Sequence, residues 1–210
     1  MNRLSRNSFM ACLIAIPALA VVWSGRLSAD EPKDAPAPTQ PPVIVNAADF
    51  KTLQAAIDTL PATGGMVRLP AGTFEITEPL RISTAETRIE GAGAATHIKN
   101  VNQQGLPAMI VRAPTRETDR RAQLWRVQLG NFRISGNEKS GDGIRAEGIE
   151  EIFIQGVSID HHGGHGISMD LCRENPRVAD SMITYNKQAG LHIVGGHDIV
   201  VNANHFEENQ

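Results

Sequence analysis

The stretch GDGIRAEGIEEIFIQGVSIDHHGGHGISMD, residues 141–170, carries one short pattern twice, because a Gly–Ile pair opens an alternating apolar segment at Gly143 and again at Gly166. Gly190 opens a third such segment, and the intervals between the three glycines are 23 and 24 residues. Other columns repeat at intervals of 23 to 25 residues: Ile134, Ile159, Ile183 and Phe206; Ile154, Val178 and Val201; and Asn137, His162, Asn186 and Asn209. A fixed period of this length indicates a repeat architecture.

Each repeat contains short strand-like segments separated by turns rich in Gly, Asn and Asp. A unit of this size cannot bury its own apolar face. Stacked units can, because like residues of neighbouring parallel strands lie about 4.8 Å apart. We therefore predict an all-β fold, a parallel β-helix or solenoid with coils of about 23 residues. The Asn column is expected to form a ladder of side-chain amides along the stack.

One amphipathic helix is predicted before the repeats. The segment DFKTLQAAIDTL places Phe50, Leu53, Ile57 and Leu60 at helical spacing, and Asp49 is the expected N-cap. The strand-like pieces MVRL, TFEI, LRI and TRIE follow it. The expected order is thus one N-terminal capping α-helix and then a strand-rich chain.

The segment LQAAIDTLPATGGMVRLPAGTFEITEPLRISTAETRIEGAGAATHI, residues 53–98, resembles the opening region of the pectin lyase-like superfamily. The later GDGI, GHGI and AGLHI pieces resemble its generic coil repeats. The resemblance covers about Phe50 to Gln210 and implies a right-handed parallel β-helix. It does not decide the activity, because this fold carries lyases, hydrolases, epimerases and non-catalytic proteins.

The N-terminal residues 1–29 are predicted to be an export signal, because Arg3 and Arg6 precede an apolar stretch too short to span a membrane. Cleavage is expected after Ala29, and an uncleaved anchor is the alternative. Residues 30–42 contain five prolines and are expected to form an extended linker. Residues 43–210 are expected to form the β-helix domain of a secreted or periplasmic protein, with no membrane association after signal cleavage.

Charge and cysteine content narrow the function further. Without residues 1–29 the chain has 17 basic and 23 acidic residues, a net charge of −6, which argues against nucleic-acid partners. Only Cys172 then remains, so no internal disulfide is expected. A turn thiol with no base pattern beside it is expected to be inert.

The repeat register gathers ionisable residues on one sheet face. Asp142 and His165 become neighbours in adjacent coils, about 5 Å apart. Outward positions of the next strand are predicted to be Arg145, Glu147, Ser168, Asp170 and His192. The candidate catalytic residues are His165, His192, Arg145 and Asp142, and the candidate substrate-binding residues are Glu147, Ser168 and Asp170. The family resemblance implies that such a face lies along a substrate groove.

Two functions from different classes fit this face. The first is action on an acidic polysaccharide by elimination or epimerisation, in which His165, His192 or Arg145 abstracts a proton next to a sugar carboxylate. Calcium held by acids such as Asp160 and Asp170 is a candidate cofactor. The second is a non-catalytic β-helix that binds glycan or protein along the same face. The chain is alternatively an N-terminal fragment of a larger enzyme.

The histidines also have plainer interpretations. His165 lies in an ordinary turn column and His162 in the Asn column, so both are explained without a ligand. Zinc binding by His161, His162 and His165 is an alternative, although adjacent residues of an extended chain point to opposite sides. GHGIS resembles the Gly-His-Gly motif of polygalacturonases, but their paired-aspartate motif one coil earlier and their Arg-x-Lys motif are absent, which argues against that activity.

The arginine-rich residues 112–133 and the C-terminal end of the chain each lead to a further prediction. Residues 112–133 contain six arginines, and this stretch is either a loop that grips an anionic glycan or a solvated excursion from the coil. After Asn209 no helix or polar cap follows, whereas solenoids normally cover their ends. We therefore expect the β-helix to be incomplete at its C-terminal end, or its last coil to dock on a partner.

Overall fold

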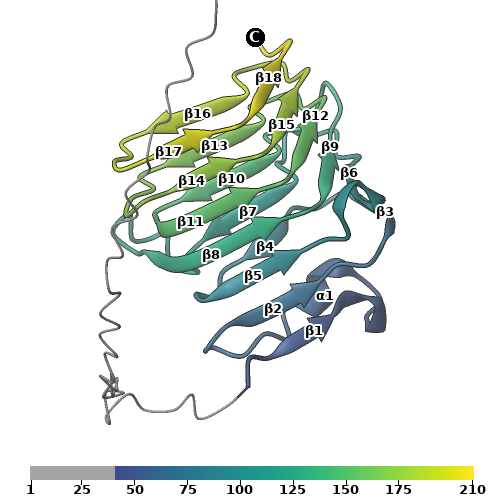
Figure 1. The fold of residues 1–210 in the computed structure, drawn as a ribbon, viewed down its shortest axis with the longest axis vertical. Helices are drawn as coiled ribbons and strands as arrows, with labels where there is room; N and C mark the ends of the chain where they lie inside the picture. The colour runs from purple at the N-terminus through teal and green to yellow at the C-terminus, as the bar shows by residue number, and fades with distance from the viewer. Residues whose placement is uncertain (1–40) are drawn as a thin grey trace, which may run out of the picture. The chain divides into compact units, whose positions relative to one another are not determined.

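The computed structural model describes residues 41–210, and these residues form a parallel β-helix (Figure 1). The predicted signal segment and most of the predicted linker lie outside the described residues. The chain passes repeatedly through three sheets, which we call A, B and C, and every strand pairing within them is parallel. The predicted fold class is confirmed.

The strands follow the order A, B, C along most of the chain. Sheet A has seven strands: β1 (Ile44–Asn46), β2 (Gly65–Arg68), β5 (Thr87–Glu90), β8 (Leu124–Gly130), β11 (Ile149–Gln155), β14 (Arg177–Ala179) and β17 (Val200–Asn202). Sheet B has six: β3 (Gly72–Ile76), β6 (Thr96–Asn100), β9 (Arg133–Ser135), β12 (Ser158–Asp160), β15 (Met182–Thr184) and β18 (His205–Glu207). Sheet C has five: β4 (Leu80–Ile82), β7 (Met109–Arg112), β10 (Ile144–Glu147), β13 (Ile167–Asp170) and β16 (Leu191–Val194).

The register matches the period read from the sequence. In sheet C, Ile167 pairs with both Ile144 and Leu191. In sheet B, the column Ile134, Ile159, Ile183 and Phe206 is continuous, and in sheet A the same holds for Ile154, Val178 and Val201. The apolar side chains of these columns fill the interior, where Ile134, Ile144, Ile154, Ile159 and Ile167 have no exposed surface.

Stacked residues with positive φ close three of the corners. Between sheets A and B they are Asn131, Gly156, Asp180 and Ala203; after sheet B they are His161, Tyr185 and Glu208; after sheet C they are Gly148, Leu171 and Gly195. A residue in the left-handed conformation turns the chain sharply at the corner. Its backbone N–H donates to a carbonyl of the next coil, as the N–H of Leu171 does to the carbonyl of Val194 at 2.8 Å. Most of these residues are not glycine, so the stacked hydrogen bonds stabilise a conformation that L-residues rarely adopt.

The predicted Asn ladder is present in its C-terminal half. The Nδ2 of Asn186 donates to Oδ1 of Asn209 at 2.8 Å, and the backbone N–H of His162 donates to Oδ1 of Asn186 at 3.0 Å. Asn137 instead donates to the carbonyls of Asn100 and Asn102 in the preceding coil. The column is therefore a polar stack, buried at His162 and Asn186 and half-buried at Asn137 and Asn209, in which His162 occupies an asparagine position.

The N-terminal helix is shorter than predicted, and its cap is different. A 3-10 helix (η1, Ala47–Asp49) precedes α1 (Leu53–Ile57), whose N-cap is Thr52, with Oγ1 accepting from the N–H of Ala55 at 3.1 Å. The prediction of Asp49 as N-cap was wrong because that residue ends η1. Leu53 and Ile57 are buried, as expected of a capping helix. The GAGAAT segment is a turn between coils and contains η2 (Gly93–Ala95). Within the described residues, no helix is long and apolar enough to cross a membrane.

Candidate functional site

A hollow of about 470 Å³ lies over sheet C, and we call it the sheet-C groove. Its lining includes the seven residues predicted from the repeat register, namely Asp142, Arg145, Glu147, His165, Ser168, Asp170 and His192, together with Gln188. Arg145, Ser168 and His192 form one row, because Arg145 pairs with Ser168 and Ser168 with His192. Glu147 and Asp170 are directly paired in the same strands. The structure therefore brings all the predicted site residues together.

Asp142 organises one end of the groove. Its buried carboxylate accepts a hydrogen bond from the backbone N–H of His165 at 2.9 Å through Oδ1. Oδ2 accepts from Nε of Arg145, also at 2.9 Å. The predicted proximity of Asp142 and His165 is confirmed, but the contact is to the backbone of His165 rather than to its ring. Asp142 is thus placed to position two neighbours, and both of its oxygens are occupied.

His165 and His192 form a stacked pair of imidazoles. Their ring centroids are 4.3 Å apart and the ring planes differ by 3°. Nδ1 of His165 is buried without a hydrogen-bond partner, so Nε2 is the nitrogen that can meet a ligand. Burial lowers the pKa of His165 from its usual 6.5, opposed by the charge of Asp142 and assisted by the charges of His192 and Arg145. A neutral imidazole that can accept a proton therefore faces the groove at neutral pH.

Arginines balance the other two acids of the groove. Nη1 of Arg112, the last residue of β7, lies 3.1 Å from Oε2 of Glu147. Nη2 of Arg120 lies 3.9 Å from Oδ2 of Asp170, and the Arg120 side chain is 81% exposed. The arginine-rich stretch is exposed over most of residues 114–121, as a solvated excursion would be, but Arg112 and Arg120 also reach two acids of the groove.

Arg116 has a structural role in this stretch. It is 6% exposed, and its guanidinium donates to the carbonyls of Arg120 and Ala122, which ties the loop after β7 into a compact turn. A Cβ at Gly148 would collide with the same guanidinium, which explains why that corner carries glycine. Arg116 therefore fixes the backbone of the loop, whereas the side chain of Arg120 extends from the loop into solvent beside Asp170.

The other predicted histidines do not join the groove as ligands. The ring of His162 is completely buried; Nδ1 lies 3.4 Å from Oγ of Ser140, and Nε2 has no partner. Burial lowers the pKa of His162 to about 4. His161 is exposed, donates from Nδ1 to Oδ1 of Asp160 at 2.7 Å and stacks on Tyr185. The three histidines of the zinc hypothesis thus have three different surroundings.

The calcium hypothesis also finds no support in the donor set. The carboxylate of Asp160 receives two hydrogen bonds from Arg133, at 2.9 and 3.2 Å, and one from His161. It belongs to sheet B, whereas Asp170 belongs to sheet C. Among residues 41–210, no three His, Cys, Asp or Glu side chains gather in a group that could hold a metal ion. Asp160 and Asp170 therefore do not fit a shared cation.

Cys172 is buried behind sheet C, with no exposed surface. Burial raises the pKa of its thiol to about 11, so the thiolate is scarce at neutral pH. The prediction of an inert thiol agrees with these surroundings.

Comparison with known proteins supports the fold. The family described as the right-handed beta helix region matches residues 117–210. Among solved structures, ORF18 of Geobacillus virus E2 is 22% identical with a TM-score of 0.71, and the match covers 80% of this chain and 37% of that one. The A-module of Azotobacter vinelandii mannuronan C-5 epimerase AlgE6 is 19% identical with a TM-score of 0.52, over 79% of this chain and 56% of that one.

This chain therefore spans less than two thirds of either of these two structures. No curated protein matches the sequence. These matches support the fold described above, and the chain has a right-handed parallel β-helix fold.

Proposed function

We propose that the chain acts outside the cytoplasm on an acidic polysaccharide, and that it abstracts a proton next to a uronate carboxylate in the sheet-C groove. The observation that carries this proposal is the stacked pair of His165 and His192 beside the guanidinium of Arg145. A neutral base and a fixed cation are the two groups that this proton transfer requires.

The chemistry assigns one role to each group. Nε2 of His165 accepts the proton on the carbon next to the carboxylate, and the electron pair of that C–H bond moves into an enediolate. Arg145, held by Asp142, pairs with the carboxylate oxygens and stabilises the added negative charge. Return of a proton from water to the opposite face gives epimerisation. In elimination the electron pair forms a C=C bond as the bond to the neighbouring glycosidic oxygen breaks, and that oxygen leaves with the proton held by the His165 imidazolium.

The charge balance of the groove is compatible with an anionic chain. Arg112 and Arg120 offset Glu147 and Asp170, while Arg145 offsets Asp142. Arg120 is held only by a long ion pair and can exchange Asp170 for a substrate carboxylate. The fold shared with the A-module of a mannuronan C-5 epimerase also supports a polysaccharide ligand and this type of reaction.

The second candidate is binding without turnover along the same groove. It is favoured by the occupation of both oxygens of Asp142 and by the ion pair of Glu147, because these acids are then unavailable as a second acid or base. In this case Arg145, Ser168 and His192, which lie in one row on three successive coils, would contact successive sugar units of the glycan without reacting.

Deuterium exchange separates the two candidates. The full chain is incubated in D₂O with mannuronan, polygalacturonate and a glycosaminoglycan, with and without calcium, and the products are followed by proton NMR and ultraviolet absorbance. Epimerisation replaces the abstracted proton with deuterium, whereas elimination removes that proton and leaves a carbon–carbon double bond in the product.

The matched variants are His165→Ala, His192→Ala and, as control, His205→Ala, which removes an exposed histidine of sheet B. Deuterium exchange or an unsaturated product that is lost in His165→Ala and retained in the control supports catalysis. Saturable binding with neither exchange nor unsaturation supports the binding module, and no binding of any uronate polymer contradicts both candidates.

A further inference from the structure

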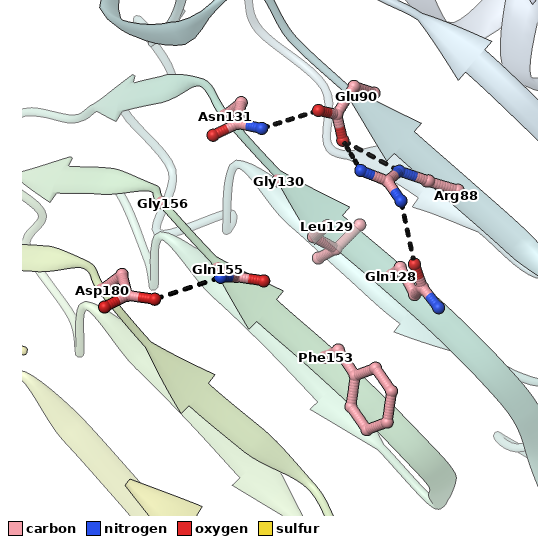
Figure 2. A pocket seen from close by; sticks show the side chains of 10 residues that line it. All are labelled: Arg88, Glu90, Gln128, Leu129, Gly130, Asn131, Phe153, Gln155, Gly156 and Asp180. Atoms are coloured by element: carbon pink, nitrogen blue, oxygen red, sulfur yellow. Dashed lines mark hydrogen bonds and ion pairs between the residues drawn. The ribbon is translucent and has the colours of Figure 1, made fainter. Parts of the chain in front are cut away.

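A second hollow lies on a different face of the solenoid, over sheet A. It has a volume of about 270 Å³ and is bordered by Arg88, Glu90, Gln128, Phe153, Gln155 and Asp180, which we call the sheet-A hollow (Figure 2). A smaller hollow of about 190 Å³ adjoins it and shares Arg88, Gln128 and Phe153. Together they form a continuous depression across β5, β8 and β11.

The side chains of the sheet-A hollow are held in place before any ligand arrives. On one side Asn131 donates to Glu90 at 2.6 Å, Glu90 accepts from Arg88 at 3.0 Å, and Arg88 donates to Gln128 at 3.4 Å. On the other side Gln155 donates to Asp180 at 3.0 Å. Figure 2 shows these two hydrogen-bonded lines with Leu129 and Gly130 between them. A preformed site of this kind loses little side-chain entropy on binding.

The floor is open because Gly130 carries no side chain. A Cβ at this position would come within 3.3 Å of both the Gln155 carbonyl and the Glu90 carboxylate. Leu129 next to it is buried and belongs to the core. The glycine therefore leaves a gap between the side chains of its two strand partners, Glu90 and Gln155.

The ring of Phe153 supplies an apolar wall. It is partly exposed on the outer face of β11, and the guanidinium of Arg177 lies 5.2 Å from its centroid on the next strand. Arg177 therefore fixes one side of the ring. Planar polar groups and one aromatic ring converging on a small hollow are the lining expected of a site that orients a polar ligand with an apolar face.

The charge of the hollow selects against an anion. Arg88 is its only cation among the residues that line it, and Glu90 pairs with that guanidinium, while Asp180 adds a second carboxylate. The adjoining hollow contains Glu86 and Glu151 against Arg126, which pairs with Glu86. A uronate chain would meet uncompensated carboxylates here, whereas sugar hydroxyls can donate to them and accept from the amides of Gln128 and Asn131.

We propose that the sheet-A hollow binds a neutral glycan chain, with the C–H face of one sugar ring on Phe153 and its hydroxyls on Glu90, Gln155 and Asp180. Neighbouring strands are about 4.8 Å apart, close to the length of one sugar unit, so a chain laid across β5, β8 and β11 meets one row of polar groups per unit. This surface would hold the protein on a neutral polymer while the sheet-C groove meets its own ligand on another face.

Direct titration of the full chain with cellohexaose, mannohexaose, maltohexaose and an oligogalacturonate hexamer tests the proposal. At least one neutral hexamer is expected to bind with a Kd in the millimolar range or tighter. Phe153→Ala and Gln155→Ala are each expected to weaken that binding about tenfold, the loss typical of an anchoring contact. Gln155 is exposed, so its truncation leaves the fold intact; circular dichroism checks Phe153→Ala.

The matched control is His192→Ala, which alters the sheet-C groove and is expected to leave the Kd for the neutral hexamer unchanged. Three results would overturn the proposal: binding by none of the neutral hexamers, which would leave the hollow to a protein or peptide; binding that survives both sheet-A substitutions; or binding lost in His192→Ala. Because the readout is binding of an unreactive neutral glycan, these outcomes do not depend on catalysis in the sheet-C groove.

Discussion

The backbone N–H of His165 donates a hydrogen bond to Oδ1 of Asp142, 23 residues earlier in the chain, and this bond joins two coils at the edge of the sheet-C groove. The same carboxylate holds Arg145. One buried side chain therefore sets the position of both the proposed base and the proposed cation. Its removal affects the geometry of the site and the pairing of the coils together.

We predict that Asp142→Ala lowers the free energy of unfolding by about 1–3 kcal/mol, because a buried N–H loses its acceptor and a guanidinium loses its counter-charge. Asp142→Asn is expected to cost less, since the amide oxygen can still accept from His165. Urea denaturation measures both values. Equal losses in the two variants would show that the ion pair, rather than the backbone bond, provides the stability.

Truncation of His165, in the turn before β13, should lower the free energy of unfolding much less than truncation of Ile167, the first residue of that strand. Ile167→Ala is expected to cost about 2–4 kcal/mol, because its buried side chain leaves a cavity between two coils. His165→Ala is expected to cost much less, since the ring lies at the surface of the groove and Nδ1 makes no hydrogen bond. Chemical denaturation compares them directly, and a similar loss for His165→Ala would make its ring structural.

The pKa of His165 should be coupled to the charge of the imidazole stacked on it. Burial is the main cause of the lowered pKa of His165, and the charge of protonated His192 contributes further. His192→Ala is therefore expected to raise the pKa of His165 towards 6.5, measured by NMR of the ring protons. In the unaltered protein, activity that depends on neutral His165 is expected to persist below pH 6.5, the usual pKa of histidine, and to fall only at a more acidic pH. An unchanged pKa in His192→Ala would contradict the coupling.

The repeat period was sufficient to predict which residues share a face. Because parallel strands pair residues one coil apart, counting 23 or 24 positions placed Arg145, Ser168 and His192 in one row. The alternation of inward and outward side chains along each strand then separated them from the buried residues Ile144, Ala146, Ile167 and Met169. Fold, register and the composition of the sheet-C groove thus follow from local spacing.

Other features have no such signal. The segment after β7 breaks the period, since Met109 pairs with Ile144 over 35 residues, so the approach of Arg112 and Arg120 to the groove depends on how that loop folds. The repeat also gives the positions of side chains but not their hydrogen-bond partners, so it placed Asp142 beside His165 without indicating that the carboxylate binds the backbone N–H. The sheet-A hollow has no repeat signal in the sequence, because it depends on the absence of a side chain at Gly130 between neighbouring strands.

His162 provides a test of acid stability. Its pKa falls from the usual 6.5 to about 4 because the ring is buried, whereas in the unfolded chain it titrates near 6.5. Between these values the unfolded chain binds one more proton than the folded one, so stability is full above pH 6.5 and decreases as the pH falls towards 4. At about 1.4 kcal/mol per pKa unit, the free energy of unfolding that is lost by pH 4 through protonation of His162 in the unfolded chain is about 3 kcal/mol.

We predict that His162→Asn removes most of this acid-dependent loss. Asparagine has no titrating group in this range, and it can extend the ladder that Asn186 and Asn209 already form. The ring leaves a small cavity beside Gly136 and Gly143, so a modest loss of stability is expected at neutral pH. The free energy of unfolding is measured in urea at several values between pH 4 and pH 7, with His205→Asn as the exposed control. If His162→Asn retains the slope of the unaltered protein, the acid sensitivity arises elsewhere, with the partly buried His97 and His165 as the next candidates because burial lowers the pKa of both.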